Sequence, residues 1–421
     1  MSNPGFYGWK LLATFWVVMF INLAFPAYGS SVINAAMLTD LHLDRQTLGW
    51  VFSTYMIMSG LPGPLVAVSI NRYGVRTTLL IGSALIIAGS LYMALFAHTG
   101  LQAAFGFGLL VGTGVATGAA LASQAGLARW FVRRRALALS ILYSAGGIGG
   151  FVAAPLLNRV ITAADGNWRV GWWLIAGLSA LAAVIAALFV RERPADLGQH
   201  PDGDPPQGAP GHTQRKRPAW VSPVSWNYRD VVRTVPFWAM LLTFSGGSAG
   251  YTLFLAHGIV HLQDLGHTRA AGAWAVGILS ISSLLAKLLI AALGDRLDPR
   301  YLWGIFTLVF GIGLVIVVDA RSPLLVFLFA ACIGIGFGGG LVCMMAVLSN
   351  YYGVQAFAGL SGLAVALNTS LSAIAPFIAG WLYDRGYGYA GSFYATAAWC
   401  LAGGLVLLLM RRPSRDEHAT G

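Results

Sequence analysis

The sequence predicts an all-α membrane protein whose twelve transmembrane helices form two pseudo-symmetric six-helix bundles. Of the 421 residues, 57% are hydrophobic and only 10% are charged, a composition that excludes an ordinary soluble protein. The apolar segments are each about 20 residues or longer, enough to cross ~30 Å of hydrocarbon at 1.5 Å per residue. Motifs of the first half also recur in the second half, which indicates two related bundles.

The first apolar segment runs from about Leu11 to Met37 and is too long for the hydrophobic region of a cleavable signal, so we expect it to be the first span. Further apolar segments follow, separated by turn residues or charges. In order along the chain, spans are predicted at residues 11–36, 47–70, 77–97, 101–128, 137–158, 169–190, 234–262, 270–293, 302–319, 323–348, 356–383 and 390–410.

The distribution of basic residues predicts the orientation of these spans. One side of the membrane receives Arg72, Arg76, Arg133, Arg134, Arg135, Arg296, Arg300, Arg411 and Arg412. The other side receives Arg45, Arg159, Arg169, Arg269, Arg321 and Arg385. Because basic loops stay in the cytoplasm, we expect both termini to be cytoplasmic and the protein to lie in the inner (cytoplasmic) membrane. The same topology explains the net charge of +11 better than a nucleic-acid partner does.

The two halves are joined by a polar segment. Residues 193–232 are rich in proline, glycine and charge, so we expect a cytoplasmic linker between an N-terminal bundle at 1–192 and a C-terminal bundle at 233–421. NRYGVR at 71–76 corresponds to GDRLDPR at 294–300. Parallel halves of six spans are typical of alternating-access carriers, which bind cargo near the midplane between the halves.

These motifs resemble the major facilitator superfamily across nearly the whole chain. Within it, the chain is similar to the monocarboxylate porters and their oxalate/formate-antiporter relatives, through YGWK at 7–10, AFPAYG at 24–29, RWFVRRRALALSILYSAGGIGGFVAAPLL at 129–157 and HGIVHLQDLGH at 257–267. The resemblance implies the major facilitator fold. It also implies a cytoplasmic gating motif at Asn71, Arg72, Arg76, Asp295 and Arg296, although Asn71 replaces an acid and Asp298 a glycine of the family pattern.

Lys287 is a cation inside an apolar span, in LLAKLLIAAL at 284–293. Ser280, Ser283 and Lys287 share one helical face, so we expect this polar stripe to face a cavity. The fifteen Asp and Glu residues map to loops, termini or helix ends, which leaves the ammonium group without an acid. A buried charge needs a counterion, and the cargo can supply it. The alternative is a lysine that snorkels to lipid headgroups or bonds backbone carbonyls.

By resemblance, Lys287 stands where the porters carry an arginine that pairs with a substrate carboxylate. Ser283 stands where they carry an acid, and Ala27 where they carry a lysine, the groups to which proton coupling is attributed. Asn368 replaces the second cation of the oxalate exchanger. One cation suits one carboxylate, so the resemblance implies a monoanion, and proton symport and anion exchange both stay open.

Three further residues are candidate substrate contacts. His257 ordinarily titrates between pH 5 and 8, but it can equally be a helix-end histidine exposed to water. Tyr28 matches a pocket tyrosine of the oxalate exchanger and can hydrogen-bond a carboxylate, with core packing as its alternative. Asn368 is a mid-helix amide for which an interhelical hydrogen bond is the alternative.

The predicted function is therefore secondary active transport of a small organic monoanion, such as a lactate-like monocarboxylate, by alternating access. We expect a monomer in the lipid bilayer, with protons as a candidate second substrate, no catalytic activity and no nucleic-acid partner. No cofactor or metal is expected, since Cys332, Cys343 and Cys400 show no paired spacing. The alternatives are an organic anion exchanger, an exporter of a larger or drug-like solute, a membrane enzyme and a receptor without transport.

Overall fold

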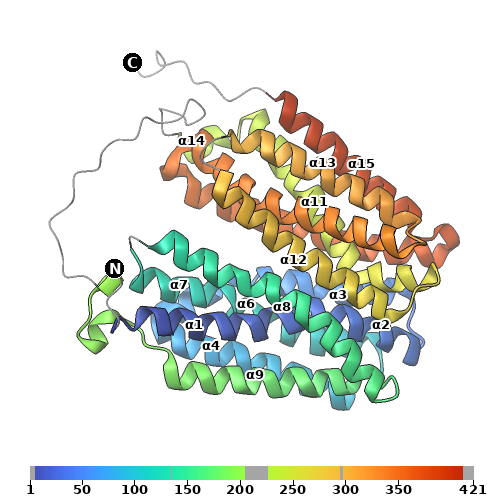
Figure 1. Ribbon diagram of the computed structural model, residues 1–421, viewed down its shortest axis with the longest axis horizontal. Helices are drawn as coiled ribbons and strands as arrows, with labels where there is room; N and C mark the ends of the chain where they lie inside the picture. The colour runs from blue at the N-terminus through green and yellow to red at the C-terminus, as the bar shows by residue number, and fades with distance from the viewer. Residues whose placement is uncertain (1–4, 133, 204–225, 294–296, 411–421) are drawn as a thin grey trace.

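The computed structural model describes residues 5–132, 134–203, 226–293 and 297–410, which fold almost entirely into helices (Figure 1). The first bundle consists of α1 (Gly8–Met19), η1 (Phe20–Gly29), α2 (Ser30–Asp40), α3 (Arg45–Gly60), α4 (Gly63–Phe96), α5 (Gly100–Ala103), η2 (Ala104–Val111), α6 (Gly112–Gly118), α7 (Ala120–Trp130), α8 (Arg135–Ala163) and α9 (Arg169–Phe189). The second consists of α11 (Val235–Asp264), α12 (Arg269–Leu293), α13 (Pro299–Val318), α14 (Pro323–Leu382), η5 (Tyr383–Tyr387) and α15 (Ala390–Leu409). The described parts of the predicted linker contain η3 (Pro194–Leu197), η4 (Pro201–Gly203) and α10 (Tyr228–Val231).

The twelve predicted spans are confirmed. Within the described residues, 11 helical segments are long and apolar enough to cross a membrane. The longest, Arg45–Phe96, has 52 residues and contains Gly74, whose φ of 87° and ψ of 170° are not helical. Gly74 therefore divides this segment into the predicted spans 47–70 and 77–97. In α14 the same kind of break occurs at Gly353, with φ 81° and ψ 168°, and the spans on its two sides, Pro323–Gly353 and Leu363–Tyr387, are already counted separately among the 11, so the division at Gly74 brings the number to twelve.

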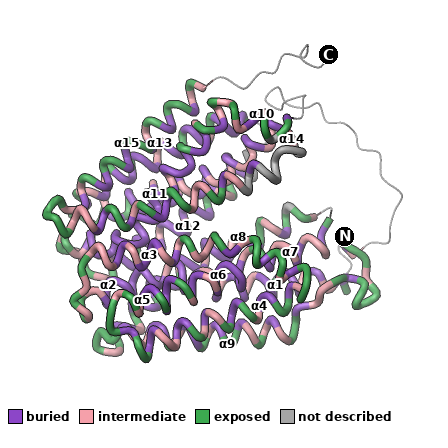
Figure 2. The backbone as a smooth tube through the Cα atoms, turned by 180° about the vertical axis from the view of Figure 1, so that it is seen from behind, coloured by how far each residue is buried: buried purple, intermediate pink, exposed green. Residues whose placement is uncertain are grey.

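The two bundles are joined over only part of their length. We call the end at which α1 begins and α9 and α15 end the linker end, and the opposite end the far end. Near the linker end the buried apolar side chains form two separate cores, one in each bundle. Towards the far end a single core contains residues of both bundles, among them Phe52 and Phe254. Figures 1 and 2 show the bundles diverging towards the linker end.

Glycines allow the two bundles to approach closely where they meet. The most extensive contacts between the bundles are those of α3 with α14 and of α8 with α12. A Cβ atom on Gly49 would collide with the backbone of Pro376, and one on Gly150 would collide with Ser280. The hydrophobic effect does not drive helices together in lipid. Helix association depends instead on close van der Waals packing, which small residues at such crossings allow.

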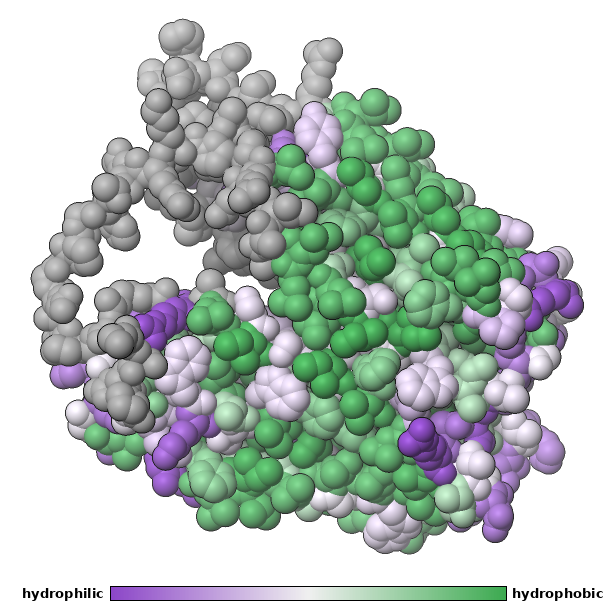
Figure 3. Space-filling model, viewed as in Figure 1, coloured by the Kyte–Doolittle hydropathy of each residue, from purple (hydrophilic) through white to green (hydrophobic). Residues whose placement is uncertain are grey.

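The outer surface fits a lipid environment. Figure 3 shows a broad apolar surface across the middle of the molecule, with hydrophilic residues gathered towards the ends. Large apolar side chains are exposed in both bundles, for example Leu65 and Leu101 at 73% each and Leu324 at 66%. Together with the apolar helices, this surface makes the chain a multi-pass membrane protein.

Gly74 gives a direct test of this backbone geometry. Its φ and ψ lie in a region that only glycine adopts readily, and a Cβ atom there would come within 2.6 Å of the Glu192 carboxylate. Gly74→Ala should therefore cost about 1–3 kcal/mol in backbone strain and lower the thermal unfolding midpoint of the purified protein. Gly177→Ala is the matched control, because a Cβ atom on this exposed helical glycine meets nothing within 4 Å. Equal midpoints for the two variants would contradict the described turn.

Candidate functional site

A cavity of about 250 Å³ lies between the two bundles. The first bundle supplies most of its wall and α11 of the second bundle completes it. The lining residues are Leu23, Ala27, Tyr28, Tyr55, Met56, Ser59, Val115, Ala116, Ala119, Ala120, Leu121, Tyr251 and Leu255. Pro26, which lacks the N–H that a regular helix needs, lies in the π-helical η1 beside the first-helix residues of this wall.

Three tyrosines provide most of the polar groups of the cavity. The phenol groups of Tyr28, Tyr55 and Tyr251 lie close enough together to interact electrostatically. Two of the rings are held by stacking: Tyr55 on Phe107 with centroids 4.5 Å apart, and Tyr251 on Phe337 at 3.8 Å. The rings of Tyr55 and Tyr251 are therefore fixed by the protein core. Of the three, only Tyr28 was predicted from the sequence.

Lys287 lies on the inward face of α12. The residues that share its face are buried, namely Ser280, Ser283, Leu284 and Ile290. On the opposite face Leu285, Leu288 and Leu289 are 51–59% exposed. Lys287 itself is half-buried, and no hydrogen bond or ion pair joins its side chain to another described residue. The polar stripe thus lies on the buried side of α12, but none of Ser280, Ser283 and Lys287 is among the residues that line the cavity, so its exposure to a cavity stays a prediction.

Lys287 is not among the residues that line the cavity, and α12 reaches the neighbourhood of the wall about two turns earlier, at Ser280. Ser280 and Tyr28 both lie against Gly150 of α8, which places Ser280 beside the cavity wall. Lys287 follows Ser280 by about 10 Å along the helix axis towards the linker end. The Cα–Cβ bonds of a helix are tilted towards its N-terminus, so the Lys287 side chain begins in the direction of Ser280.

His257 does not line the cavity. It is fully buried, and both ring nitrogens are engaged: Nε2 lies 2.8 Å from the carbonyl oxygen of Pro376, and Nδ1 lies 3.0 Å from the hydroxyl of Tyr389. Because a carbonyl can only accept, Nε2 donates, and Nδ1 of the neutral ring accepts from Tyr389. Pro376 in turn contacts Gly49 of the first bundle. His257 thus supports the contact between the bundles.

The other two predicted contacts also lie outside the cavity wall. Ser283 is buried where α12 packs on Gly338 of α14. Asn368 is half-buried in α14, and its Oδ1 atom has no hydrogen-bond partner among the described residues. Its neighbour Thr369 contacts Gly60 of the first bundle. Both residues are therefore near the boundary between helices or bundles, and their role in binding stays a prediction.

The predicted gating motif lies at the linker end. Asn71, Arg72 and Arg76 are exposed there, and Arg72 stacks on Tyr73 at 5.4 Å. Asp295 and Arg296 lie outside the described residues.

Glu192, which sequence reasoning did not select, organises the helix ends next to this motif. Its carboxylate accepts hydrogen bonds from the backbone N–H groups of Val75 and Arg76 and pairs with Arg129 at 2.7 Å. The available signal was its rarity, since Glu192 and Glu417 are the only glutamates in the chain.

A polar contact between the bundles closes the far end. Asp384 of η5 accepts hydrogen bonds from the backbone N–H groups of Arg45 and Gln46 at 3.1 and 2.7 Å, and thereby caps α3 of the other bundle. The guanidinium of Arg45 pairs with Asp264 at 3.0 Å and lies over the ring of Tyr383. We call these five residues the far-end latch. Sequence reasoning missed the latch because its partners are hundreds of residues apart.

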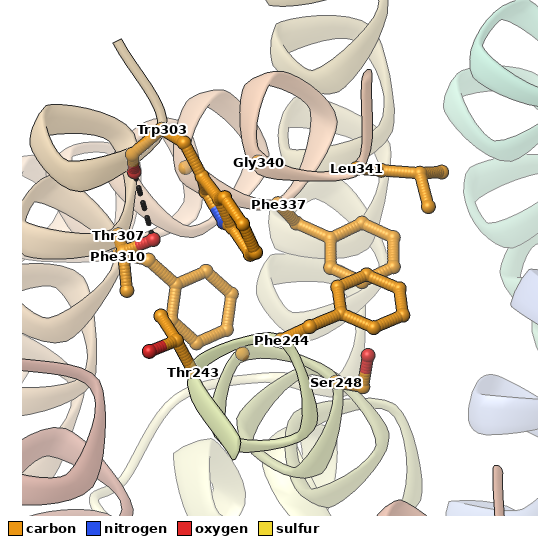
Figure 4. A pocket seen from close by; sticks show the side chains of 11 residues that line it. Thr243, Phe244, Ser248, Trp303, Thr307, Phe310, Phe337, Gly340 and Leu341 are labelled. Carbon is orange, nitrogen blue, oxygen red and sulfur yellow. Dashed lines mark hydrogen bonds between the residues drawn. The ribbon is translucent and has the colours of Figure 1, made fainter. Parts of the chain in front are cut away.

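A second, much smaller pocket lies inside the second bundle among α11, α13 and α14 (Figure 4). Phe244, Phe310, Phe337 and Trp303 form its walls, and Thr307 donates a hydrogen bond to the carbonyl of Trp303. Its volume of about 20 Å³ is close to the space one water needs, so it cannot hold an organic anion.

Comparisons with known proteins fit this geometry. The family model described as Major Facilitator Superfamily matches residues 11–272 and 258–421. Monocarboxylate transporter 13 of Bos taurus is 27% identical over 289 residues, which cover 68% of this chain but only 62% of that protein. Monocarboxylate transporter 14 of Mus musculus is 24% identical, with 96% of this chain and 90% of that protein covered.

Solved structures share the architecture. A D-xylose-proton symporter superposes with a TM-score of 0.68 at 16% identity, covering 95% of this chain and 97% of that one. A bacterial homologue of the human lysosomal transporter Spinster, in an inward-facing and occupied conformation, gives a TM-score of 0.70 at 14% identity, with 97% of each chain covered. At these identities the likeness shows the fold alone.

The far-end latch predicts how one substitution changes the conformational equilibrium. Asp384→Ala removes the carboxylate that caps α3 across the bundles, so molecules open at the far end should become more populated. In a variant without the three native cysteines, Ser59→Cys in the cavity wall reports this opening. A membrane-impermeant thiol reagent applied from the far side should label it several-fold faster when Asp384 is replaced.

Asp165→Asn is the control for this measurement, because Asp165 is exposed at the same end and has no described contact with the second bundle. An equal labelling rate with and without Asp384 would contradict the role of the latch.

Proposed function

The chain belongs to the Major Facilitator Superfamily, and we propose that it is a secondary carrier that moves a small organic monoanion across the membrane by alternating access. The names of its relatives support a monocarboxylate as the cargo. The observation that carries the proposal is Lys287: a cation on the inward face of an apolar helix, with no described counterion.

Electrostatics favours an anion as the missing partner. A lysine at the centre of a membrane helix costs ~2.5–3.5 kcal/mol on insertion scales, and the cost falls when the charge meets an anion or water. In the described part of the chain, every acidic residue lies at a helix end or in a connection, so none reaches the middle of a span. The position of Lys287 disfavours snorkelling to lipid, because the residues on its face of α12 are buried and the exposed leucines lie on the opposite face.

The separation of the bundles supports alternating access. The cavity wall is shared between the bundles, the far end is closed by the latch, and the linker end has two separate cores. Rocking of the bundles about the glycine contacts between them would close the linker end and open the far end. We place the linker end in the cytoplasm on the charge distribution, so the described conformation is the inward-facing one.

The arrangement limits where a coupled proton could travel. His257 uses both ring nitrogens within the protein, and no described carboxylate accompanies Lys287. A proton that moves with the cargo is therefore carried by Lys287 or by the acid itself, and exchange of one anion for another needs no proton at all.

The proposal is tested by substitution of the cation. Lys287→Ala should reduce uptake of monocarboxylates into proteoliposomes by more than about 30-fold, which corresponds to ~2 kcal/mol. Lys287→Arg keeps the charge and should retain part of the activity, although the guanidinium is larger and planar.

Lys10→Ala is the matched control, because Lys10 is exposed at the linker end, and it should transport like the unmodified protein. Thermal unfolding checks that each variant is folded. Normal uptake by a folded Lys287→Ala protein would refute the charge anchor.

A further inference from the structure

Building on the proposed function, we infer that the cargo is a monocarboxylate with a large apolar body, a branched-chain or aromatic acid rather than a two- or three-carbon acid. Its body would occupy the cavity with Tyr28, Tyr55 and Tyr251, and its carboxylate would pair with Lys287. The chemistry of the wall, the size of the cavity and the position of Lys287 support this inference independently.

The wall offers little to a polar body. Apart from the three phenols, Ser59 is its only hydroxyl side chain, and it already donates to the backbone carbonyl of Met56. No charged side chain is among the lining residues of the described chain. A cargo with further carboxylates or many hydroxyls would lose water contacts here without replacing them, whereas alkyl and aromatic groups gain contact with the aliphatic side chains.

The size of the cavity favours a body of several carbons. An engineered protein cavity of ~150 Å³ accommodates benzene, and the cavity here measures about 250 Å³. An acid of two or three carbons would contact only a small part of the apolar wall, so it would gain little from dispersion. A phenyl or branched alkyl group would contact the apolar wall, and the tyrosine rings would add aromatic surface.

The position of Lys287 requires a cargo of some length. Ser280 lies beside the cavity wall, and Lys287 follows it by about 10 Å along α12. The lysine stem spans part of this distance, and the cargo must span the rest. An elongated acid can place its carboxylate at Lys287 while its apolar end contacts Tyr28 and Tyr251, which a formate- or acetate-sized anion cannot do.

Binding of a matched series of ligands to the purified full-length protein tests the inference. The series contains acetate, lactate, 4-methylpentanoate, 3-phenylpropanoate and the uncharged 3-phenylpropanamide, and dissociation constants are measured by calorimetry. We expect 4-methylpentanoate and 3-phenylpropanoate to bind at least tenfold more tightly than acetate and lactate, and the amide at least tenfold more weakly than its acid.

The possible outcomes separate the inference from the proposed function. Tighter binding of acetate or lactate would overturn the large apolar body and leave the monoanion carrier intact. Equal binding of the amide and its acid would overturn the charge anchor and with it the proposed function. Failure of every acid to bind would overturn both.

A cavity-filling substitution tests the location of the body. Ala120 is half-buried in the cavity wall, so Ala120→Leu should weaken binding of 3-phenylpropanoate at least tenfold and change that of acetate less than twofold. Ala27→Val is a smaller substitution in the same wall and should also weaken binding of 3-phenylpropanoate more than that of acetate. It replaces Ala120→Leu in this test if the leucine variant does not fold.

Ala180→Leu is the control, since Ala180 is exposed on the outer face of α9, and it should leave both affinities unchanged. Equal loss of affinity for both acids in folded Ala120→Leu and Ala27→Val would overturn the assignment of the apolar body to this cavity.

Discussion

The structure depends on one electrostatic constraint: a charge buried in a membrane protein must have a counterion, a dense set of hydrogen bonds or access to water. The described acids satisfy it at helix ends, where Glu192 binds two backbone N–H groups and Arg129, and Asp384 caps α3. Lys287 stands apart, because no other described residue pairs with it. The cargo proposed for the carrier follows from this exception.

The same constraint links binding to motion. The bundles touch through glycine contacts in the middle and through the latch at the far end, and towards the linker end each has its own core. Lys287 belongs to the second bundle, whereas most of the cavity wall belongs to the first. In the proposed binding mode, an anion held by Lys287 with its body against the first bundle would connect the two bundles, and its binding energy would stabilise the conformation that encloses it. Because a carrier must also release its cargo, this contact has to remain moderate in strength.

Much of the fold was predictable because membrane helices are marked by length and composition alone. The apolar segments, the turns between them and the repeat of NRYGVR as GDRLDPR needed no knowledge of contacts. The inward orientation of Lys287 followed from its helical register with Ser280 and Ser283. The break at Gly74 was predicted as a connection between two spans, and the structure adds that glycine alone fits its backbone angles.

The tertiary contacts were not predictable, since a single sequence does not show which side chains meet. His257 could be a ligand or a wetted helix end by pattern, and the structure instead places it between Pro376 and Tyr389. Tyr55 and Tyr251 line the cavity, but an aromatic residue in an apolar span gives the same signal when it packs in the core. The pairing of Arg45 with Asp264 and Asp384 required both bundles to be in place.

The most direct test of this account is an experimental structure of the protein with a bromine-labelled monocarboxylate, in which the anomalous signal of bromine locates the apolar end and the density locates the carboxylate. We predict a carboxylate oxygen within about 4 Å of the Lys287 Nζ atom, with the bromine in the cavity between the bundles. A bound anion remote from Lys287, together with an ammonium group that turns towards lipid or bonds only to protein atoms, would contradict the account.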